Sequence, residues 1–137
     1  MTVTTVACEW RGAFENGEVE ELHAEGFGHP PAPDFDWRGQ VERFSLGWVC
    51  ARRAADGALV GFVNVAWDGC GHAFVLDTVV AVAERRRGVG RALVECAVEH
   101  ARAAGCEWLH VDFEEKWREF YLEGCGFRPT GAGLVRL

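Results

Sequence analysis

The first two thirds of the chain alternate between short apolar stretches and turn-forming residues, a pattern that predicts β-strands. The stretches are residues 3–8, 46–52, 59–67 and 72–82. Asp56-Gly57 separates the second stretch from the third, and Asp68-Gly69-Cys70-Gly71 separates the third from the fourth. Because such dipeptides form tight turns, we expect the last three stretches to be antiparallel neighbours.

Two segments show helical spacing instead. Apolar residues at positions 89, 93, 97, 101 and 104 lie on one face of a helix over about residues 88–104, with Gly105 as its stop. Asn16 is a suitable cap for a helix that runs through Leu22 and Ala24. The stretch 26–33, with three prolines, predicts a loop that leads into a short helix near 37–44.

The remaining elements complete a mixed sheet. Residues 107–113 predict a fifth strand, parallel to 72–82 because a helical crossover joins them. A short helix over 115–123 and a last strand over 128–137, bent at Pro129, follow. The fold class is therefore α/β (α+β), with a single mixed, mostly antiparallel sheet and helices on both faces. Without a linker or repeat, residues 1–137 are expected to form a single domain.

Composition narrows the class of protein. The formal net charge of −7 makes a nucleic-acid partner unlikely, because phosphate contacts need clustered Lys and Arg. The sequence has no apolar stretch near the ~20 residues of a membrane span and no leader-like start, so we expect a cytoplasmic protein that does not bind membranes. The six cysteines show no C-x-x-C spacing and the five histidines are dispersed, which favours free thiols and no metal site.

One basic turn stands out on this acidic chain. Arg85, Arg86 and Arg87 precede Gly88 and Gly90, between the strand that ends near Val82 and the helix that follows. Backbone N–H groups at such a strand–turn–helix junction suit an anionic phosphate group. A Rossmann dinucleotide site fits poorly because the third glycine and the βαβ repeat are missing, and a Walker A loop lacks its Gly-Lys-Ser/Thr.

Two motifs carry a family resemblance. The turn Arg85-x-x-Gly88-x-Gly90 with Arg91-Ala92-Leu93-Val94, and the later Phe120-Tyr121-x-x-x-Cys125-Gly126-Phe127, resemble motifs of the GNAT family of N-acetyltransferases. The resemblance implies the acyl-CoA N-acyltransferase (GNAT) fold and direct transfer of an acetyl group from acetyl-CoA to a primary amine. The acceptor is a small molecule or a peptide that the sequence does not identify. Dimers are common in such proteins, so a homodimer is also an expectation.

The resemblance also assigns roles to residues. The turn and first helical residues would bind the CoA pyrophosphate: Arg85, Arg86, Arg87, Gly88, Val89, Gly90 and Arg91. The backbone of Thr78, Val79 and Val80 would pair with the pantetheine arm and polarise the thioester carbonyl. Tyr121, the only tyrosine, would protonate the leaving thiolate. The alternative for Tyr121 is an aromatic core residue on an amphipathic helix.

The base and the acceptor pocket are less defined. Alternation along 107–113 predicts that His110 and Asp112 share a face, and either is a candidate base, with Asp77 as a further option. Aromatic and imidazole side chains are candidates for the acceptor pocket or for ordinary packing: Phe27, His29, Phe35, Trp37, Trp48 and Trp67. Two other functions stay open: an acyl-CoA-binding sensor without turnover, and transfer of a longer acyl group.

Overall fold

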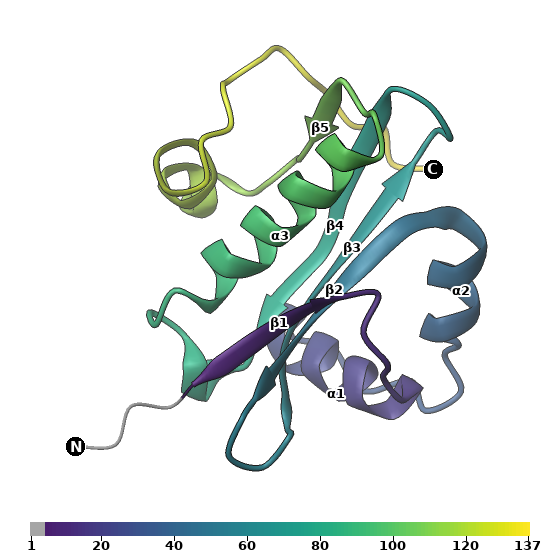
Figure 1. Cartoon of the computed structure of the whole chain (residues 1–137), viewed down its shortest axis with the longest axis vertical. Coiled ribbons are helices and arrows are strands. Elements are labelled where there is room, and N and C mark those ends of the chain that lie inside the picture. Colours follow the sequence, from purple (N-terminus) through teal and green to yellow (C-terminus); the bar gives the residue numbers. More distant parts are fainter. Residues whose placement is uncertain (1–4) are drawn as a thin grey trace.

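A five-stranded mixed sheet forms the centre of the molecule (Figure 1). The structure is a computed structural model that describes residues 5–137. The strands lie side by side in chain order, and β1 to β4 are antiparallel whereas β5 is parallel to β4. This confirms the predicted mixed, mostly antiparallel sheet. The bounds are β1 Val6–Trp10, β2 Ser45–Arg53, β3 Leu59–Trp67, β4 His72–Val80 and β5 Trp108–His110.

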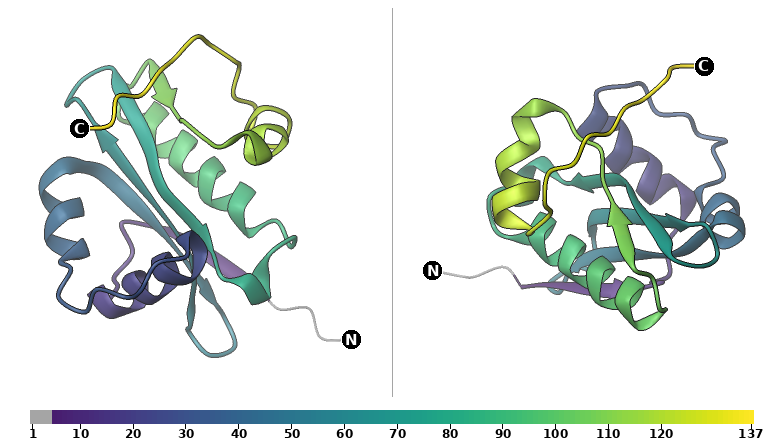
Figure 2. Two further views of the ribbon diagram at one scale, coloured as in Figure 1. Left: turned by 180° about the vertical axis from the view of Figure 1, so that it is seen from behind. Right: turned by 90° about the horizontal axis from the view of Figure 1, so that it is seen from above.

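Helices cover both faces of this sheet (Figures 1 and 2). Helix α3, Val89–Ala103, packs on one face, and α1, Asn16–Phe27, and α2, Trp37–Phe44, pack on the other. Alternation along β2 explains the two layers: Val49 faces the α3 core, whereas Trp48 faces the core beneath α1 and α2. Each face of the sheet therefore has its own apolar core.

Helix α1 differs slightly from the prediction. Its cap is Glu15, in a capping box with Glu18, and Asn16 is the first helical residue. The Asn16 side chain instead donates to Asp36 Oδ1 at 3.1 Å and accepts from the Arg38 N–H at 2.9 Å, which ties α1 to α2. The helix continues to Phe27, beyond the expected end, and Gly28 terminates it at φ 71°.

The last part of the chain departs most from the prediction. Strand β4 ends at Val80, and a 3₁₀ turn over Val82–Glu84 replaces the predicted end of the strand. Strand β5 has three residues, so the strand expected over 107–113 is mostly irregular. The expected helix over 115–123 is present as a continuous helical segment, which begins as a 3₁₀ turn, Glu115–Trp117, and ends as a π-turn, Phe120–Gly124.

The predicted last strand over 128–137 is wrong, because these residues have no regular secondary structure. Leu134, Val135 and Leu137 are exposed there. The apolar pattern was not enough, since a strand also needs a partner edge, and β5 is too short to supply one. The predicted start of the first strand at Val3 lies outside the described residues. Within residues 5–137, no helix is long and apolar enough to cross a membrane.

Candidate active site

A β-bulge in β4 shapes the site. Phe62 of β3 pairs with Val79 and Asn64 pairs with Leu76, so Asp77 and Thr78 together face one residue of β3. Asp77 has φ 57°, a conformation that Asp tolerates better than most residues. Both side chains are half-buried and line a cleft beside the sheet. Bulges commonly re-aim side chains in this way.

The cleft forms because β4 and β5 diverge. They pair over three residues, from His72 with Trp108 to Phe74 with His110, and the chain then leads away from β4 towards the turn at residues 120–124 (Figure 1). The resulting cleft has a volume of about 1050 Å³. Its walls come from β4, the start of α3, the segment after β5 and the π-turn.

Beyond Phe74, the edge of β4 facing the cleft has no strand partner among the described residues. The Ala81 N–H bonds the Val60 carbonyl of β3 at 2.8 Å. Because the groups of an antiparallel ladder alternate, the N–H and C=O of Val80 point away from β3. Arg85 Nε donates to that Val80 carbonyl at 3.3 Å. The Val80 N–H therefore faces the side on which an extended ligand would lie.

The start of α3 closes one end of the cleft. Arg86 and Gly88 both adopt positive φ, 64° and 83°, which makes the turn tight enough for the helix to begin at Val89. No side chain caps the helix, and its first ladder bond runs from the Ala92 N–H to the Gly88 carbonyl. The N–H groups of Val89, Gly90 and Arg91 are therefore available to an anion.

Gly90 is also needed for close packing. A Cβ at this position would lie 3.2 Å from Phe120 Cζ, which belongs to the π-turn across the cleft. The glycine therefore lets the helix start approach the turn that carries Tyr121. The two sequence motifs, about thirty residues apart, meet here.

The arginines of the turn divide into two groups. Arg85, Arg86 and Arg91 line the cleft. Arg87 Nη1 instead lies 3.6 Å from Glu84 Oε2 and borders a smaller cavity of about 170 Å³ beside Val6. Glu84 is buried and also accepts from Arg53 Nε at 3.1 Å. Arg87 thus lies away from the predicted phosphate site, although its neighbours line it.

Tyr121 lines the cleft with its ring held by three phenylalanines. It stacks on Phe113 at 5.2 Å between ring centroids and meets Phe120 and Phe127 edge-on. Burial is the main cause that raises the pKa of Tyr121 above its ordinary value, and a side-chain hydrogen bond with Thr78 acts in the opposite direction. The phenol is therefore neutral at physiological pH and can donate a proton.

The structure separates the two base candidates predicted on the fifth strand. Asp112 lines the cleft, whereas His110 lies outside it. His110 Nε2 lies 2.7 Å from His72 Nδ1, and its ring stacks on Phe74. The expected shared face does not form because β5 ends at His110. The role of His110 stays a prediction that this geometry does not favour.

Sequence reasoning missed a chain of polar side chains that starts in the cleft at Asp77. Asp77 Oδ1 lies 3.1 Å from His23 Nε2, and His23 Nδ1 lies 2.6 Å from His29 Nε2. Glu20 Oε2 lies 3.9 Å from His29 Nδ1. In the sequence, Asp77 is recognisable as a carboxylate within an apolar strand. His23 lies 54 positions from Asp77, and no motif or spacing connects the two.

The residues expected in the acceptor pocket have mixed positions. Phe27 lines the cleft at its α1 side. Trp37 and Trp48 are core residues, whose indole N–H groups donate to Glu20 Oε1 and the Gly12 carbonyl. Phe35 packs on Trp37, and Trp67 packs against the α3 core. For Trp37, Trp48 and Trp67, the geometry favours the packing alternative.

The cysteines and histidines do not gather at this site. All six cysteines are free, and burial raises the pKa of Cys50 to about 12, which keeps this thiol protonated. Among residues 5–137, no group of three or more His, Cys, Asp or Glu side chains has a geometry suited to a metal ion.

Comparisons with known proteins identify the family of this chain. The family model of the acetyltransferase (GNAT) family matches residues 9–127, so the chain belongs to that family. This confirms the resemblance carried by the two motifs. A search of curated proteins gave no significant sequence match.

Solved structures share the fold over nearly the whole chain. A glucosamine-6-phosphate N-acetyltransferase from Arabidopsis thaliana has a TM-score of 0.75 at 17% identity, covering 96% of this chain and 98% of that one. An acetyltransferase from Trypanosoma brucei has a TM-score of 0.77 at 22% identity, covering 95% and 99%. An aminoglycoside N-acetyltransferase in complex with CoA has a TM-score of 0.72 at 16% identity, covering 99% and 96%. At these identities, the likeness establishes the fold and leaves the acceptor open.

Proposed function

We propose that this protein is an N-acetyltransferase that moves the acetyl group of acetyl-CoA directly to a primary amine of a small molecule or peptide. Membership of the GNAT family supports acyl transfer in general. The observation that carries the proposal is the cleft, which brings the open edge of β4, the bare start of α3 and the Tyr121 phenol together. No one of these groups would be sufficient alone.

The CoA pyrophosphate binds at the start of α3. The N–H groups of Val89, Gly90 and Arg91 donate to its oxygens, and Arg85 and Arg86 add positive charge. The pantetheine arm then extends along β4 beside Thr78, Val79 and Val80, in the manner of an added strand, and the Val80 backbone, which faces away from β3, supplies the pairing groups. This orientation directs the thioester towards the bulge and Tyr121.

The transfer itself needs an oxyanion donor, an acid and a base. The amine nitrogen attacks the thioester carbon, and the Val80 N–H stabilises the negative charge that develops on the oxygen. The intermediate collapses and the C–S bond breaks. The departing thiolate takes the phenolic proton of Tyr121, and the phenolate later takes a proton from water. The proton lost by the amine goes to a base in the cleft, where both Asp77 and Asp112 lie.

The test is release of free CoA thiol from acetyl-CoA over a panel of primary amines. The panel includes polyamines, amino sugars, aromatic amines and peptides with a free N-terminus or a Lys. The wild type should release CoA with at least one amine, and Tyr121→Phe should release it much more slowly. Mass spectrometry of the product identifies the N-acetyl group.

Three results would change the conclusion. Acetyl-CoA binding without turnover on any amine favours the sensor alternative, in which the cleft binds the thioester and transfers nothing. Faster turnover with a longer acyl-CoA than with acetyl-CoA corrects the acyl group. If the wild type does not bind CoA and Gly88→Glu changes nothing, the phosphate site itself is overturned.

A further inference from the structure

Three polar side chains connect the cleft to the protein surface. Asp77 Oδ1 lies 3.1 Å from His23 Nε2, His23 Nδ1 lies 2.6 Å from His29 Nε2, and His29 Nδ1 lies 2.8 Å from the Pro30 carbonyl. The Asp77 side chain is 26% exposed, His23 is 18% exposed and His29 is 36% exposed. The series therefore runs from the cleft, through a shielded imidazole, to an accessible one.

The number of protons in this series follows from its hydrogen bonds. The Pro30 carbonyl only accepts, so His29 Nδ1 carries a proton, and an ionised Asp77 only accepts, so His23 Nε2 carries one. If both rings were neutral, their unprotonated nitrogens, His23 Nδ1 and His29 Nε2, would then face each other at 2.6 Å. The contact between His23 Nδ1 and His29 Nε2 is a hydrogen bond only if one further proton lies between them.

The alternative arrangement gives the same count. If Asp77 is the protonated partner, its O–H donates to His23 Nε2, and the His23 proton on Nδ1 donates to His29 Nε2. In both arrangements, Asp77 and the two rings hold one proton more than an ionised carboxylate and two neutral imidazoles. One extra proton shared among Asp77 and the two rings would therefore satisfy all three contacts.

The surroundings favour a positive charge that can move outward. Glu20 is buried and lies 3.9 Å from His29 Nδ1, while its oxygens accept from the Ala32 N–H and the Trp37 indole. The His23 ring packs against Phe27 and Trp37, at 4.3 and 4.9 Å between ring centroids. Within residues 5–137, the charged groups that face the two imidazoles within 4 Å are Asp77, from β4, and Glu20, from α1.

We propose that Asp77, His23 and His29 form a proton relay that removes the proton from the acceptor's ammonium group and passes it to water at His29. This inference rests on the proposed transfer to an amine. Asp77 lines the cleft at the bulge, next to Thr78 and within the same cleft as Tyr121, so its carboxylate is the end of the relay that meets the substrate. His23 and His29 act through Asp77 and do not touch the amine.

The relay balances over one turnover. The ammonium N–H bond breaks and its proton joins the Asp77 carboxylate, which leaves a neutral amine to attack the thioester. Asp77 returns the proton to His23 Nε2 as the His23 Nδ1 proton passes to His29 Nε2. His29 then carries a proton on both nitrogens and releases the one on Nδ1 to water. Both rings now hold their proton on Nε2, and each must exchange it through water for one on Nδ1 before the relay can accept a proton from the next ammonium group.

The pH dependence of kcat/KM for a simple alkylamine tests the relay. At about pH 7 such an amine is almost entirely ammonium, so Asp77→Asn should lower kcat/KM by about 100-fold or more. Towards about pH 10 free amine is present without a base, and the loss should shrink to less than about tenfold. His29→Gln should give a smaller loss at pH 7, about tenfold, because His23 still accepts a proton.

Two control variants separate the relay from general damage. His72→Gln removes one ring of a second His–His contact, His72 with His110 at 2.7 Å, which lies outside the cleft, and should leave kcat/KM within about twofold. Asp112→Asn tests the competing carboxylate: a loss confined to low pH in this variant, in place of the one in Asp77→Asn, would assign the base role to Asp112. Acetyl-CoA binding and the thermal unfolding midpoint of each variant show that the fold and the CoA site persist.

An activity-independent measurement follows the shared proton. Nitrogen-15 NMR of the wild type should show one proton shared between His23 Nδ1 and His29 Nε2, and His29→Gln should abolish this signal. Two rings in contact without a shared proton would overturn the relay.

The kinetic outcomes are equally decisive. The relay is overturned if Asp77→Asn loses the same activity at every pH or loses none. It is also overturned if the pH profile changes in Asp112→Asn instead. In each case, transfer by the wild type leaves the proposed function standing. If the wild type acetylates no amine in the panel, the proposed function fails, and the relay falls with it as a catalytic device.

Discussion

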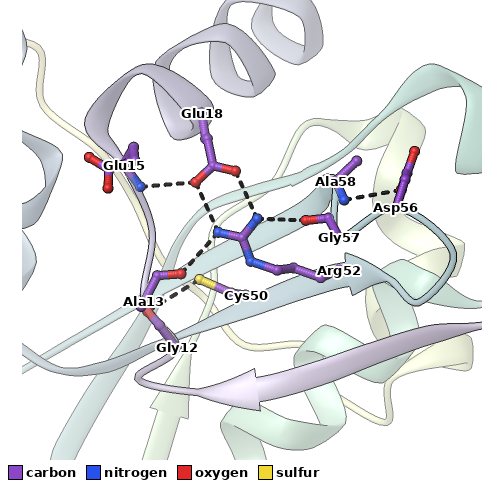
Figure 3. A network of polar contacts seen from close by, with 9 residues as sticks. All are labelled: Gly12, Ala13, Glu15, Glu18, Cys50, Arg52, Asp56, Gly57 and Ala58. Atoms are coloured by element: carbon purple, nitrogen blue, oxygen red, sulfur yellow. Dashed lines mark hydrogen bonds and ion pairs between the residues drawn. The ribbon is translucent and has the colours of Figure 1, made fainter.

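Arg52 and Glu18 form a two-pronged ion pair that fixes α1 on the sheet (Figure 3). Arg52 Nη1 donates to Glu18 Oε2 at 2.7 Å, and Nη2 donates to Oε1 at 2.9 Å. The same guanidinium bonds the carbonyls of Ala13 and Gly57. One side chain of β2 thus joins the start of α1 to the β2–β3 turn, and α1 carries His23, which contacts Asp77 of the cleft.

The first prediction concerns the stability of this pair. The hydrogen bonds from Arg52 are the main cause that lowers the pKa of Glu18 below its ordinary value of 4.5. A lowered pKa in the folded state stabilises the protein above pH 4.5, and this contribution is lost as the pH falls through the folded pKa. Glu18→Gln should cost about 1–2 kcal/mol at pH 7 and weaken the acid dependence of unfolding.

Urea unfolding at about pH 7 and about pH 4 measures both effects. Gln retains the capping-box bond to the Glu15 N–H, so the change reports the ion pair. Glu42→Gln is the control, because Glu42 pairs with Arg38 at 3.7 Å on an exposed helix face and should cost less than about 0.5 kcal/mol. Equal costs in the two variants would contradict the special role of Arg52.

A second prediction separates strain from phosphate binding at Gly88. Alanine in the left-handed region costs about 1–2 kcal/mol, so Gly88→Ala, at φ 83°, should destabilise the fold by this amount. It should also raise the Kd for acetyl-CoA by about tenfold or more, because the turn that exposes the α3 N–H groups relaxes. Isothermal titration with acetyl-CoA and urea unfolding measure the two effects.

Gly57→Ala provides the matched control. Gly57 has φ 72° with no atom within 4 Å of its Cβ direction, as at Gly88, but it lies in the β2–β3 turn away from the cleft. It should lose the same stability and bind acetyl-CoA within about twofold of the wild type. If both variants lost acetyl-CoA binding equally, general strain would explain the effect.

Elements with local boundary signals were predicted well from the sequence. Helix α2 and strand β3 have the predicted bounds, Trp37–Phe44 and Leu59–Trp67. Asp36 caps α2 by accepting from the Gly39 N–H, and Asp56 accepts from the Ala58 N–H in the turn before β3. These bonds connect residues two or three positions apart, so the sequence itself contains the information.

The errors arise where long-range pairing decides the structure. The bulge at Asp77 depends on the register of β4 against β3, and the short β5 depends on how far two strands stay parallel. Neither property is visible in hydrophobic periodicity. The segment 128–137 has strand-forming residues but lacks a strand edge to join, which a local pattern does not reveal.

The candidate site shows the same difference between residues with local sequence signals and residues placed by long-range packing. Gly88, Gly90 and Tyr121 belong to motifs and were identified through the family resemblance that these motifs carry, and they line one cleft. Arg87 stands in the motif but pairs with Glu84, because the 3₁₀ turn before it places a buried carboxylate beside it. His23 reaches Asp77 only through the packing of α1 on β4, so no motif contains it.

The third prediction tests this division of the arginines. Arg86 lines the cleft, so Arg86→Ala should weaken acetyl-CoA binding by about tenfold, equivalent to about 1.4 kcal/mol, with a smaller effect at high salt. Arg87→Ala should weaken binding by less than about threefold. It should instead lower stability by about 1 kcal/mol, because buried Glu84 keeps one cation, Arg53, and loses the other.

Titration calorimetry at two salt concentrations measures the binding of both variants. If Arg87→Ala weakens binding as strongly as Arg86→Ala, the Arg87 side chain reaches the pyrophosphate in the bound state, as the family motif implied. The distance to Glu84 would then describe the free protein only.

The last prediction concerns the ionisation of Tyr121. Since it is the only tyrosine in the chain, the phenolate absorbance of the folded protein reports this residue alone. Its midpoint should lie above the ordinary value of 10.0, because burial raises its pKa, and should return to about 10 in concentrated urea. Thr78→Val removes the hydrogen bond that lowers the pKa, so its midpoint should lie higher still.

The same ionisation should appear in the kinetics. An acid must be protonated to act, so kcat should stay constant until the pH approaches the Tyr121 pKa and fall above it. Tyr121→Phe should lower kcat by about 100-fold and lack this high-pH fall, while its packing on Phe113 and Phe127 holds the stability loss near about 1 kcal/mol. A Tyr121→Phe variant that retains the wild-type kcat would remove the phenol from the mechanism and assign its ring to packing.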